Sequence, residues 1–320
     1  MKRVLIVDPI AAAGEALLAH SAEVVRSPDS DPATIRRLAR DADGIITRSK
    51  LPDDVFQAAP RIRAVAIHGT GTDLVPLADA TARGVMVSNI PGGNAQSVAE
   101  YCVMAMLLQA RGILKIIDSL KKDTWDAARA LGADTHEIAG LTLGLVGVGE
   151  IGRRVARICR NGFGMRVLGN QRRMDRLPAD AEPATLDELV SRSDFVVVTC
   201  PLNVDTRYLF NRNLIAKMKS TAWLINVGRG PVVEEAALID ALRERRIAGA
   251  MLDVYEHYRL PPGHPIFSLD NAVLTPHLAG MTRESRGRMS VAAAGEMLRM
   301  LAGERPKNFV NPESADIAHH

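Results

Sequence analysis

Short apolar segments alternate with amphipathic segments along most of the chain. The apolar segments are rich in valine, isoleucine and leucine, and each predicts a buried β-strand. They are Val4–Val7, Gly44–Thr47, Ala64–Ile67, Val85–Ser88, Leu143–Val146, Arg166–Gly169, Phe195–Thr199, Trp223–Asn226, Gly249–Leu252 and Ala272–Leu274. The segments between them have helical spacing, as at Pro32–Arg40, Val75–Arg83, Thr185–Arg192 and Glu234–Arg243. This alternation is typical of α/β folds with mostly parallel sheets.

The strands form two series, and the join between them is helical rather than a Pro/Gly linker. Residues Ser97–Lys121 predict one long helix that leads into the second series. Its apolar stretch Tyr101–Ile117 is interrupted by Gln109, Arg111 and Lys115, so it predicts a buried helix and not a membrane span.

A second long helix is predicted at Arg283–Leu301, after the last strand. We expect the tail to return to the first series, which makes the outer domain discontinuous (1–97 and 285–320) around a second domain (98–284). The expected architecture is two doubly wound, Rossmann-like domains joined by two long helices, with a cleft between them. His319-His320 is either native or a purification-tag remnant, and we assign it no function.

A glycine-rich turn follows the strand at Leu143–Val146 and precedes an amphipathic run, which is the context of a dinucleotide-binding motif. Gly147 permits a tight turn, Gly149 lets the backbone approach a pyrophosphate, and Gly152 lets helix and strand pack closely. The helix would start at Glu150-Ile151, where free N–H groups attract an anion. The alternative is a tight strand-to-helix turn without a ligand.

Charge and cysteine content exclude several classes of protein. The net charge is +3 with both signs interspersed, so nothing points to nucleic acid. Cys102, Cys159 and Cys200 lack metal-ligand spacing and lie in apolar surroundings, which predicts buried reduced thiols, no metal site and a cytoplasmic location. Met1-Lys2-Arg3 precedes too few apolar residues for a signal peptide.

Several further motifs follow one another in order along nearly the whole chain. They are His68-Gly69-Thr70-Gly71, Pro91–Glu100, the glycine turn, Cys200-Pro201-Leu202, Asn226–Gly230, Asp253-Val254-Tyr255 and Thr275–Gly280. Together they resemble the D-isomer-specific 2-hydroxyacid dehydrogenase family, which contains phosphoglycerate dehydrogenase and hydroxypyruvate reductase. The resemblance implies an oxidoreductase whose glycine-turn domain binds a nicotinamide cofactor, whose outer domain closes over the substrate, and which forms a homodimer.

Reduction of a 2-oxo acid needs a group that holds the carboxylate and a proton donor for the keto oxygen. Arg229 suits the first task, because a planar guanidinium binds a carboxylate through two hydrogen bonds. The resemblance implies that His277 is the proton donor, and imidazole titrates near neutral pH. The alternatives are a surface-loop arginine and a capped loop histidine.

The resemblance also implies contacts around these two residues. The substrate contacts of the outer domain are Ser49, Gly69, Thr70 and Asn94, of which Ser49 is the weakest since a solvated turn explains it nearly as well. Cofactor contacts are implied at Cys200, Pro201, Thr206, Val227, Asp253, His277 and Gly280. For Asp253 the alternative is a structural turn aspartate.

Two positions depart from the family pattern, and the first concerns the cofactor. The strand after the glycine helix normally ends in an aspartate that binds the ribose 2′-hydroxyl, and here Gln171 occupies that position, followed by Arg172 and Arg173. Without the carboxylate a 2′-phosphate is not repelled, and an arginine can pair with it. This favours NADP(H). The alternative is a basic surface turn with NAD retained.

The second departure concerns the catalytic glutamate that supports the histidine in the family. By spacing from Arg229 and Asp253 its position holds Tyr258, and Glu256 lies two residues earlier. The sequence leaves open which of the two takes its place.

The sequence therefore predicts an NADP(H)-preferring oxidoreductase of small 2-oxo or 2-hydroxy acids, such as glyoxylate or hydroxypyruvate. The alternative is a cofactor-sensing binding protein of the same fold with little turnover, suggested by the altered glutamate position.

Overall fold

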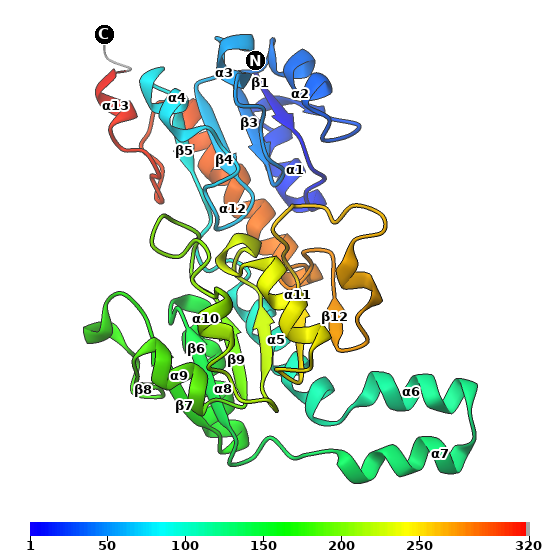
Figure 1. Cartoon of the computed structure of the whole chain (residues 1–320). Helices are drawn as coiled ribbons and strands as arrows, with labels where there is room; N and C mark the ends of the chain where they lie inside the picture. The colour runs from blue at the N-terminus through cyan, green and yellow to red at the C-terminus, as the bar shows by residue number, and fades with distance from the viewer. Residues whose placement is uncertain (318–320) are drawn as a thin grey trace. The chain divides into compact units, whose positions relative to one another are not determined.

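The computed structural model describes residues 1–317, and the chain divides into two compact units. Unit 1 contains Met1–Asn94 and the residues from Met281 on, and unit 2 contains Ala95–Gly280 (Figure 1). His319-His320 lies outside the described residues. In residues 1–317, no helix is long and apolar enough to cross a membrane.

Unit 1 is built on a parallel sheet of five strands in the order β2-β1-β3-β4-β5. The strands are β1 (Lys2–Ile6), β2 (Ala22–Arg26), β3 (Gly44–Thr47), β4 (Ala64–Ile67) and β5 (Met86–Ser88). This is one of the two common doubly wound orders, and its topological switch point lies between β1 and β3. Neighbouring residues such as Ile45 and Ile46 point into different apolar cores, so both faces of the sheet are covered.

The C-terminal helix completes unit 1. Helices α1 (Ala12–Ala19) and α12 (Arg283–Leu301) cover one face of the sheet, and α12 contacts α1, β3 and β4 (Figure 1). The other face is covered by α2 (Pro32–Ala39), α3 (Val55–Ala58) and α4 (Leu77–Ala82), and α13 (Ser314–Ile317) contacts α4. The C-terminal helices therefore pack with the first series of strands.

Unit 2 is built on a parallel sheet of seven strands in the order β12-β11-β10-β9-β6-β7-β8. The strands are β6 (Thr142–Val146), β7 (Arg166–Asn170), β8 (Glu182–Pro183), β9 (Phe195–Val198), β10 (Trp223–Asn226), β11 (Gly249–Leu252) and β12 (Ala272–Leu274). Counted within the unit this is the dinucleotide-binding order, whose switch point lies between β6 and β9.

Helices cover both faces of the unit 2 sheet. Helices α5 (Ala95–Ala110) and α8 (Glu150–Phe163) pack together on one face. The other face carries α9 (Leu186–Arg192), α10 (Arg212–Ile215) and α11 (Glu235–Arg243). Short 3₁₀ turns lie at η1 (Leu131–Asp134), η2 (Met174–Arg176), η3 (Gly230–Val232) and η4 (Pro265–Ser268). The expected α/β class with two parallel sheets is confirmed.

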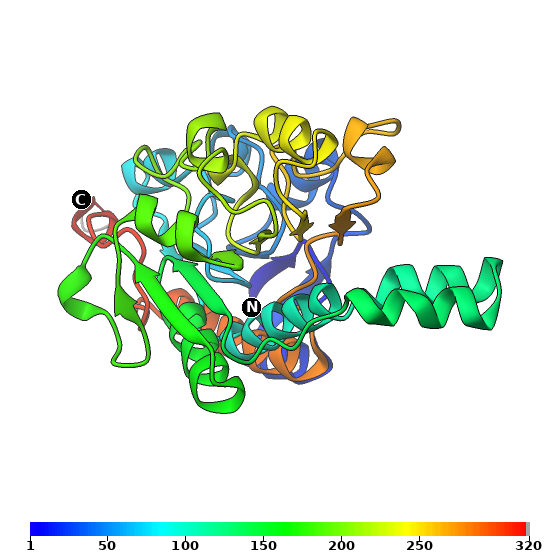
Figure 2. The same ribbon diagram turned by 60° about the horizontal axis from the view of Figure 1, so that its bottom comes forward.

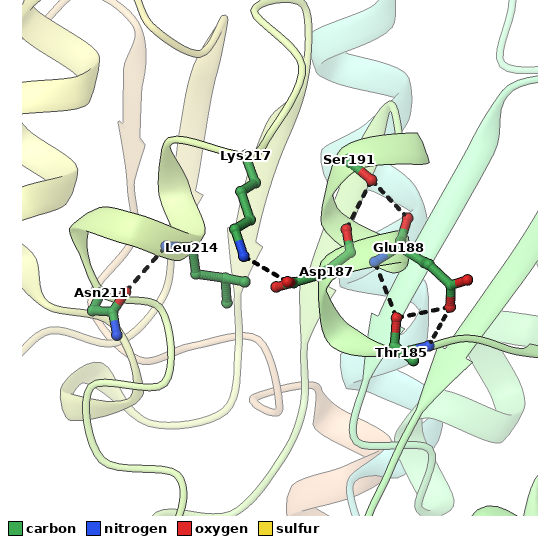
Figure 3. Close-up of polar contacts among 7 residues, drawn as sticks. All are labelled: Thr185, Asp187, Glu188, Ser191, Asn211, Leu214 and Lys217. Atoms are coloured by element: carbon green, nitrogen blue, oxygen red, sulfur yellow. Dashed lines mark hydrogen bonds and ion pairs between the residues drawn. The ribbon is translucent and has the colours of Figure 1, made fainter.

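The short helices α9 and α10 are fixed at their ends by side chains (Figure 3). Thr185 and Glu188 form a capping box at the start of α9, with Thr185 Oγ1 accepting from the Glu188 N–H at 3.3 Å. Asn211 caps α10, with its side-chain oxygen accepting from the Leu214 N–H at 3.0 Å. Lys217 forms an ion pair with Asp187 of α9, and because both side chains are exposed it contributes little to stability.

The segment Ser97–Lys121 is not one buried helix, so that prediction was wrong. Helix α5 ends at Ala110, and α6 (Ile113–Lys122) begins after Gly112, whose φ of +57° is left-handed. A left-handed glycine ends the α-helical path, although the apolar spacing continues across it. No residue of α6 is buried, and α6 and α7 (Trp125–Ala130) extend side by side away from the rest of unit 2 (Figures 1 and 2).

All the predicted strands are present, but β2 and β8 were missed. Both are edge strands. Strand β2 includes a glutamate and an arginine, and β8 has only two residues, so neither forms an apolar run. Edge strands are paired on one side only and need less apolar surface, which weakens the pattern in the sequence.

His68 is a buried polar residue of unit 1 that follows β4. Its side chain is 2% exposed, and its Nε2 atom lies 2.9 Å from Ser290 Oγ of α12. The single hydroxyl hydrogen of Ser290 is donated to the Arg286 carbonyl, so His68 Nε2 is the donor to Ser290. Burial, with a smaller effect of Arg48, lowers the pKa of His68 to about 4, and the imidazole is neutral at pH 7.

We predict that His68 makes the stability of the protein fall in mild acid. An unfolded histidine titrates near 6.5, so stability is fully present above that pH and is lost as the pH falls toward 4, by about 3 kcal/mol in total. The variant His68→Gln keeps an N–H donor but cannot titrate. Its free energy of unfolding should therefore depend less on pH. Urea unfolding of both proteins at pH 7 and pH 4.5 measures the difference. Equal pH dependence would show that His68 is not the group responsible.

Candidate active site

The glycine turn after β6 has the geometry that a bound pyrophosphate needs. Gly147 has a φ of +88°, and a Cβ there would lie 2.5 Å from the Cys200 backbone nitrogen. A Cβ on Gly152 would lie 2.7 Å from the Gly147 carbonyl oxygen, so α8 packs tightly on the turn. A Cβ on Gly149 would meet nothing within 4 Å, which leaves the backbone open to a ligand. The residues present therefore fit a dinucleotide at the N-terminus of α8, where Glu150 and Ile151 form the first turn.

The loop after β9 lies beside this turn, at the switch point of the sheet. The Thr206 hydroxyl donates to the Pro201 carbonyl at 2.7 Å and accepts from the Asn203 N–H at 2.8 Å, which fixes the loop. Burial raises the pKa of Cys200 to about 11, so its thiol remains protonated at neutral pH. Cys200 thus contributes shape to this loop, not a thiolate.

The turn after β7 carries no free carboxylate at the position of the expected aspartate. Gln171 Nε2 donates to the Arg173 carbonyl at 2.7 Å, and the Arg173 guanidinium pairs with Asp175 at 2.8 Å. Arg172 is exposed, and its side chain has no hydrogen bond or ion pair with any residue in the described part of the chain. Of the two arginines, Arg172 is therefore the one available to an anionic ligand.

Arg229 lies on a backbone segment that is enclosed from two sides. It follows β10, and the buried Asn226 side chain accepts from the Gly228 N–H at 3.1 Å and donates to the Arg229 carbonyl at 3.0 Å. A Cβ on Gly228 would lie 2.8 Å from the Cys200 carbonyl, and one on Gly230 would lie 1.7 Å from the Tyr255 carbonyl. Both glycines are thus needed for steric reasons. Asn226 therefore positions the Arg229 segment, a role that its place in the sequence motif did not indicate.

Asp253, at the end of β11, is 1% exposed and holds the loop that contains His277. Its carboxylate accepts from the backbone N–H groups of Leu278 at 2.8 Å and Ala279 at 2.9 Å. The His277 N–H donates to the Asp253 carbonyl at 2.9 Å, and His277 has a left-handed φ of +56°. Asp253 therefore has a structural role in this loop, and its predicted contact with the cofactor stays a prediction.

Tyr258, and not Glu256, lies against His277. The two ring centroids are 5.8 Å apart, with an angle of 69° between the ring planes. The Glu256 carboxylate instead accepts a hydrogen bond from the Tyr208 hydroxyl. Tyr258, which occupies the position of the family's catalytic glutamate, is thus the residue beside His277.

A contact between the side chains of Glu235 and His264 helps to fix the segment that carries Tyr258 and Glu256. Glu235 of α11 lies 3.1 Å from His264 Nε2 and accepts the Glu256 N–H at 3.2 Å.

The substrate contacts expected from unit 1 follow β3, β4 and β5. They are Ser49, Gly69, Thr70 and Asn94. The Ser49 hydroxyl donates to Asp8 at 2.7 Å, and the Ser49 N–H donates to the same carboxylate at 2.8 Å. Thr70 Oγ1 donates to the Ile90 carbonyl at 3.2 Å. These loops are ordered by hydrogen bonds within unit 1, and their contact with a substrate stays a prediction.

The remaining predicted positions lie on the same loops of unit 2. Val227 follows β10 directly, and Gly280 is the last residue of the unit, three positions after His277. Among residues 1–317, no group of three His, Cys, Asp or Glu side chains could hold a metal ion.

We predict that Gly230→Ala lowers the free energy of unfolding by about 1–3 kcal/mol or more, because the new methyl group would overlap the Tyr255 carbonyl. Gly162→Ala is the matched control, since it lies in α8 with nothing within 4 Å of an added Cβ, and it should stabilise the protein by up to about 1 kcal/mol. Urea denaturation gives both values. Similar stability of the two variants would contradict the close approach at Gly230.

Comparison with known proteins agrees with this geometry. The profile of the family "D-isomer specific 2-hydroxyacid dehydrogenase, NAD binding domain" matches residues 103–279. The chain is 37% identical to a glyoxylate reductase of Korarchaeum cryptofilum over 300 residues, which cover 91% of this chain and 89% of that protein.

Solved structures of the same fold bind either cofactor. An NADPH-dependent glyoxylate/hydroxypyruvate reductase from Sinorhizobium meliloti, in complex with NADP and malonate, has a TM-score of 0.85, 28% identity and 98% coverage of both chains. An NAD-dependent formate dehydrogenase from Staphylococcus aureus, in complex with NAD, has a TM-score of 0.85 and 26% identity, and the match covers 95% of this chain and 96% of that one. From the sequence match, the two parallel sheets and the glycine turn at the switch point, we conclude that the chain belongs to the D-isomer specific 2-hydroxyacid dehydrogenase family and is an NAD(P)-dependent oxidoreductase.

Proposed function

We propose that the protein is an NADP(H)-preferring reductase of small 2-oxo acids such as glyoxylate and hydroxypyruvate. One observation carries the proposal: Arg229 and His277 follow β10 and β12, at the carboxyl edge of the same sheet that bears the glycine turn. Ligands of doubly wound sheets bind at this edge. The names of the glyoxylate reductase and of the glyoxylate/hydroxypyruvate reductase among the similar proteins support this substrate class.

In this proposal unit 2 is the dinucleotide-binding domain. The turn Gly147–Gly152 would hold the pyrophosphate, and the loop residues Cys200, Pro201 and Thr206 would line the site. A nicotinamide cofactor bound there would supply the hydride for C2 of the oxo acid, or would accept it in the reverse direction. Arg172 would pair with a 2′-phosphate, since it is exposed and its side chain has no partner among the described residues.

The chain's own residues supply the remaining chemistry. Arg229 holds the substrate carboxylate through two parallel hydrogen bonds, which orients C2. His277 donates a proton to the keto oxygen as C2 is reduced and takes it back during oxidation. Tyr258 lies beside His277 and offers a neutral hydroxyl where the family has a carboxylate. Unit 1 would add substrate contacts through Ser49, Gly69, Thr70 and Asn94.

We also propose that the protein is a homodimer and functions in the cytoplasm. Helix α6 exposes Leu114, Ile117 and Leu120, which share one face because they are three residues apart, and α7 exposes 68% of Trp125. Exposed apolar surface of this kind is typical of an interface between subunits. Sedimentation equilibrium of the protein and of Ile117→Glu tests this, and a monomer at micromolar concentration contradicts it. The buried free thiols are compatible with a reducing compartment.

The experiment that tests the function is a spectrophotometric screen of 2-oxo acids with NADPH and with NADH. We expect turnover of glyoxylate or hydroxypyruvate, and loss of at least about 100-fold in kcat/KM for Arg229→Ala with cofactor affinity retained. Arg229→Lys, which keeps the charge but not the planar fork, should recover little. Cofactor binding without turnover of any 2-oxo acid would favour the cofactor-sensing alternative.

We predict that Arg172→Ala weakens NADPH binding about 10- to 100-fold and leaves NADH binding nearly unchanged, because one charge-assisted contact to the 2′-phosphate is lost. Arg173→Ala is the matched control, since Arg173 is already paired with Asp175. Gln171→Asp should shift the preference toward NADH. Dissociation constants from fluorescence titration measure all three. Tighter binding of NADH than of NADPH by the unmodified protein would overturn the proposed preference.

We predict that Tyr258→Glu moves the falling limb of the pH–rate profile for reduction to higher pH. A carboxylate beside an imidazolium favours the protonated form that reduction requires, and Tyr258 lies in ring contact with His277. Glu256→Gln should leave the limb in place, because Glu256 is bonded to Tyr208. A downward shift in Glu256→Gln would instead identify Glu256 as the partner.

A further inference from the structure

A hydrogen-bond network connects α5 to the loop of His277 inside unit 2, and the residues at its two ends, Tyr101 and Asp253, are buried. The Tyr101 hydroxyl of α5 lies 2.6 Å from Thr275 Oγ1, and Thr275 Oγ1 lies 2.7 Å from Asp253 Oδ1. Tyr101 is 7% exposed and Asp253 is 1% exposed, so neither has much access to water. Neither Tyr101 nor Thr275 is assigned a role by the sequence motifs.

The direction of the hydrogen bonds in this network follows from the number of hydrogens that each group can donate. The Asp253 carboxylate accepts from two backbone N–H groups, and the single hydroxyl hydrogen of Thr275 is donated to Oδ1. Tyr101 must therefore donate to Thr275. Burial raises the pKa of the Tyr101 hydroxyl well above its usual range, so the proton that it donates is present at all physiological pH values.

The Asp253 end of this hydrogen-bond network fixes the backbone around His277. Thr275 lies two residues before His277, and Leu278 and Ala279 are the two residues after it. All three donate hydrogen bonds to the carboxylate of Asp253. His277 itself has a φ of +56°, a conformation that residues other than glycine adopt only where surrounding contacts impose it. A second tyrosine, Tyr255, donates to the Thr275 carbonyl at 2.8 Å and holds the same loop from the other side.

We propose that Tyr101 and Thr275 are positioning residues for the proton donor. Thr275 and the two backbone N–H groups orient the Asp253 carboxylate, Tyr101 orients Thr275, and the carboxylate holds Thr275–Ala279 so that His277 keeps its left-handed conformation. A largely buried network in which every member is satisfied favours one arrangement, which gives the precision that proton transfer needs. The inference rests on the proposed role of His277.

The test compares Thr275→Val, which removes the hydroxyl at nearly constant volume, with Thr275→Ser, which keeps it. We expect Thr275→Val to lower kcat for reduction about tenfold or more, with cofactor affinity unchanged, and Thr275→Ser to recover most of the loss. Tyr101→Phe should show a smaller loss in the same direction. The solvent deuterium isotope effect on kcat should rise in Thr275→Val and Tyr101→Phe, because proton donation from a misplaced imidazole becomes slower.

The control is Ser193→Ala, which removes a buried hydroxyl of unit 2 whose one hydrogen bond within residues 1–317 is to the Leu189 carbonyl of α9. It should lower the melting temperature without changing kcat or the isotope effect. Unchanged kcat and isotope effect in both Thr275→Val and Tyr101→Phe would overturn the inference, as would failure of Thr275→Ser to recover activity. His277→Asn tests the role of His277 separately from the role of Tyr101 and Thr275. Full activity in that variant would refute His277 as the proton donor.

Discussion

Close approach of backbone segments at the carboxyl edge of the unit 2 sheet is the constraint on which the site depends. Parallel strands end at the same edge, so the loops after β6, β9, β10, β11 and β12 meet there. They fit together only because Gly147, Gly228 and Gly230 have no side chains, with added Cβ atoms 2.5, 2.8 and 1.7 Å from the nearest backbone atoms. The guanidinium of Arg229 and the imidazole of His277 take their positions from this packing.

Each unit uses an aspartate at a strand end to order the loop that follows another strand. In unit 1, Asp8 follows β1 and accepts from two backbone N–H groups and the Ser49 hydroxyl after β3. In unit 2, Asp253 follows β11 and accepts from two backbone N–H groups and the Thr275 hydroxyl after β12. A carboxylate satisfied by three donors is stable away from water, and it replaces flexible loop structure with one conformation. The first loop carries Ser49, which the family resemblance assigns to the substrate, and the second carries His277, which it assigns to proton transfer.

The departures from the family pattern lie on exposed loops that the sheet positions but does not bury. Tyr258 is 60% exposed and still lies in ring contact with His277, because Glu235 holds the segment around it through His264 and the Glu256 N–H. Arg172 likewise lies two residues after β7, which pairs with the strand that carries the glycine turn. A rigid scaffold with variable strand-end loops allows such chemical changes without changing the fold.

The sequence by itself determined the local features of this protein. Buried parallel strands are continuous apolar runs, and each strand predicted from such a run is present in the structure. The glycine turn was recognised from its position between a strand and a helix.

The tertiary structure decided the features that depend on contacts between residues distant in the chain. Apolar spacing could not show that α6 separates from α5 at Gly112, since exposure depends on what packs against a helix. Spacing could not choose between Tyr258 and Glu256, because the choice depends on Tyr208, nearly fifty residues away. The bonds of Asp253 to Tyr101 through Thr275 join segments that only the folded sheet brings together.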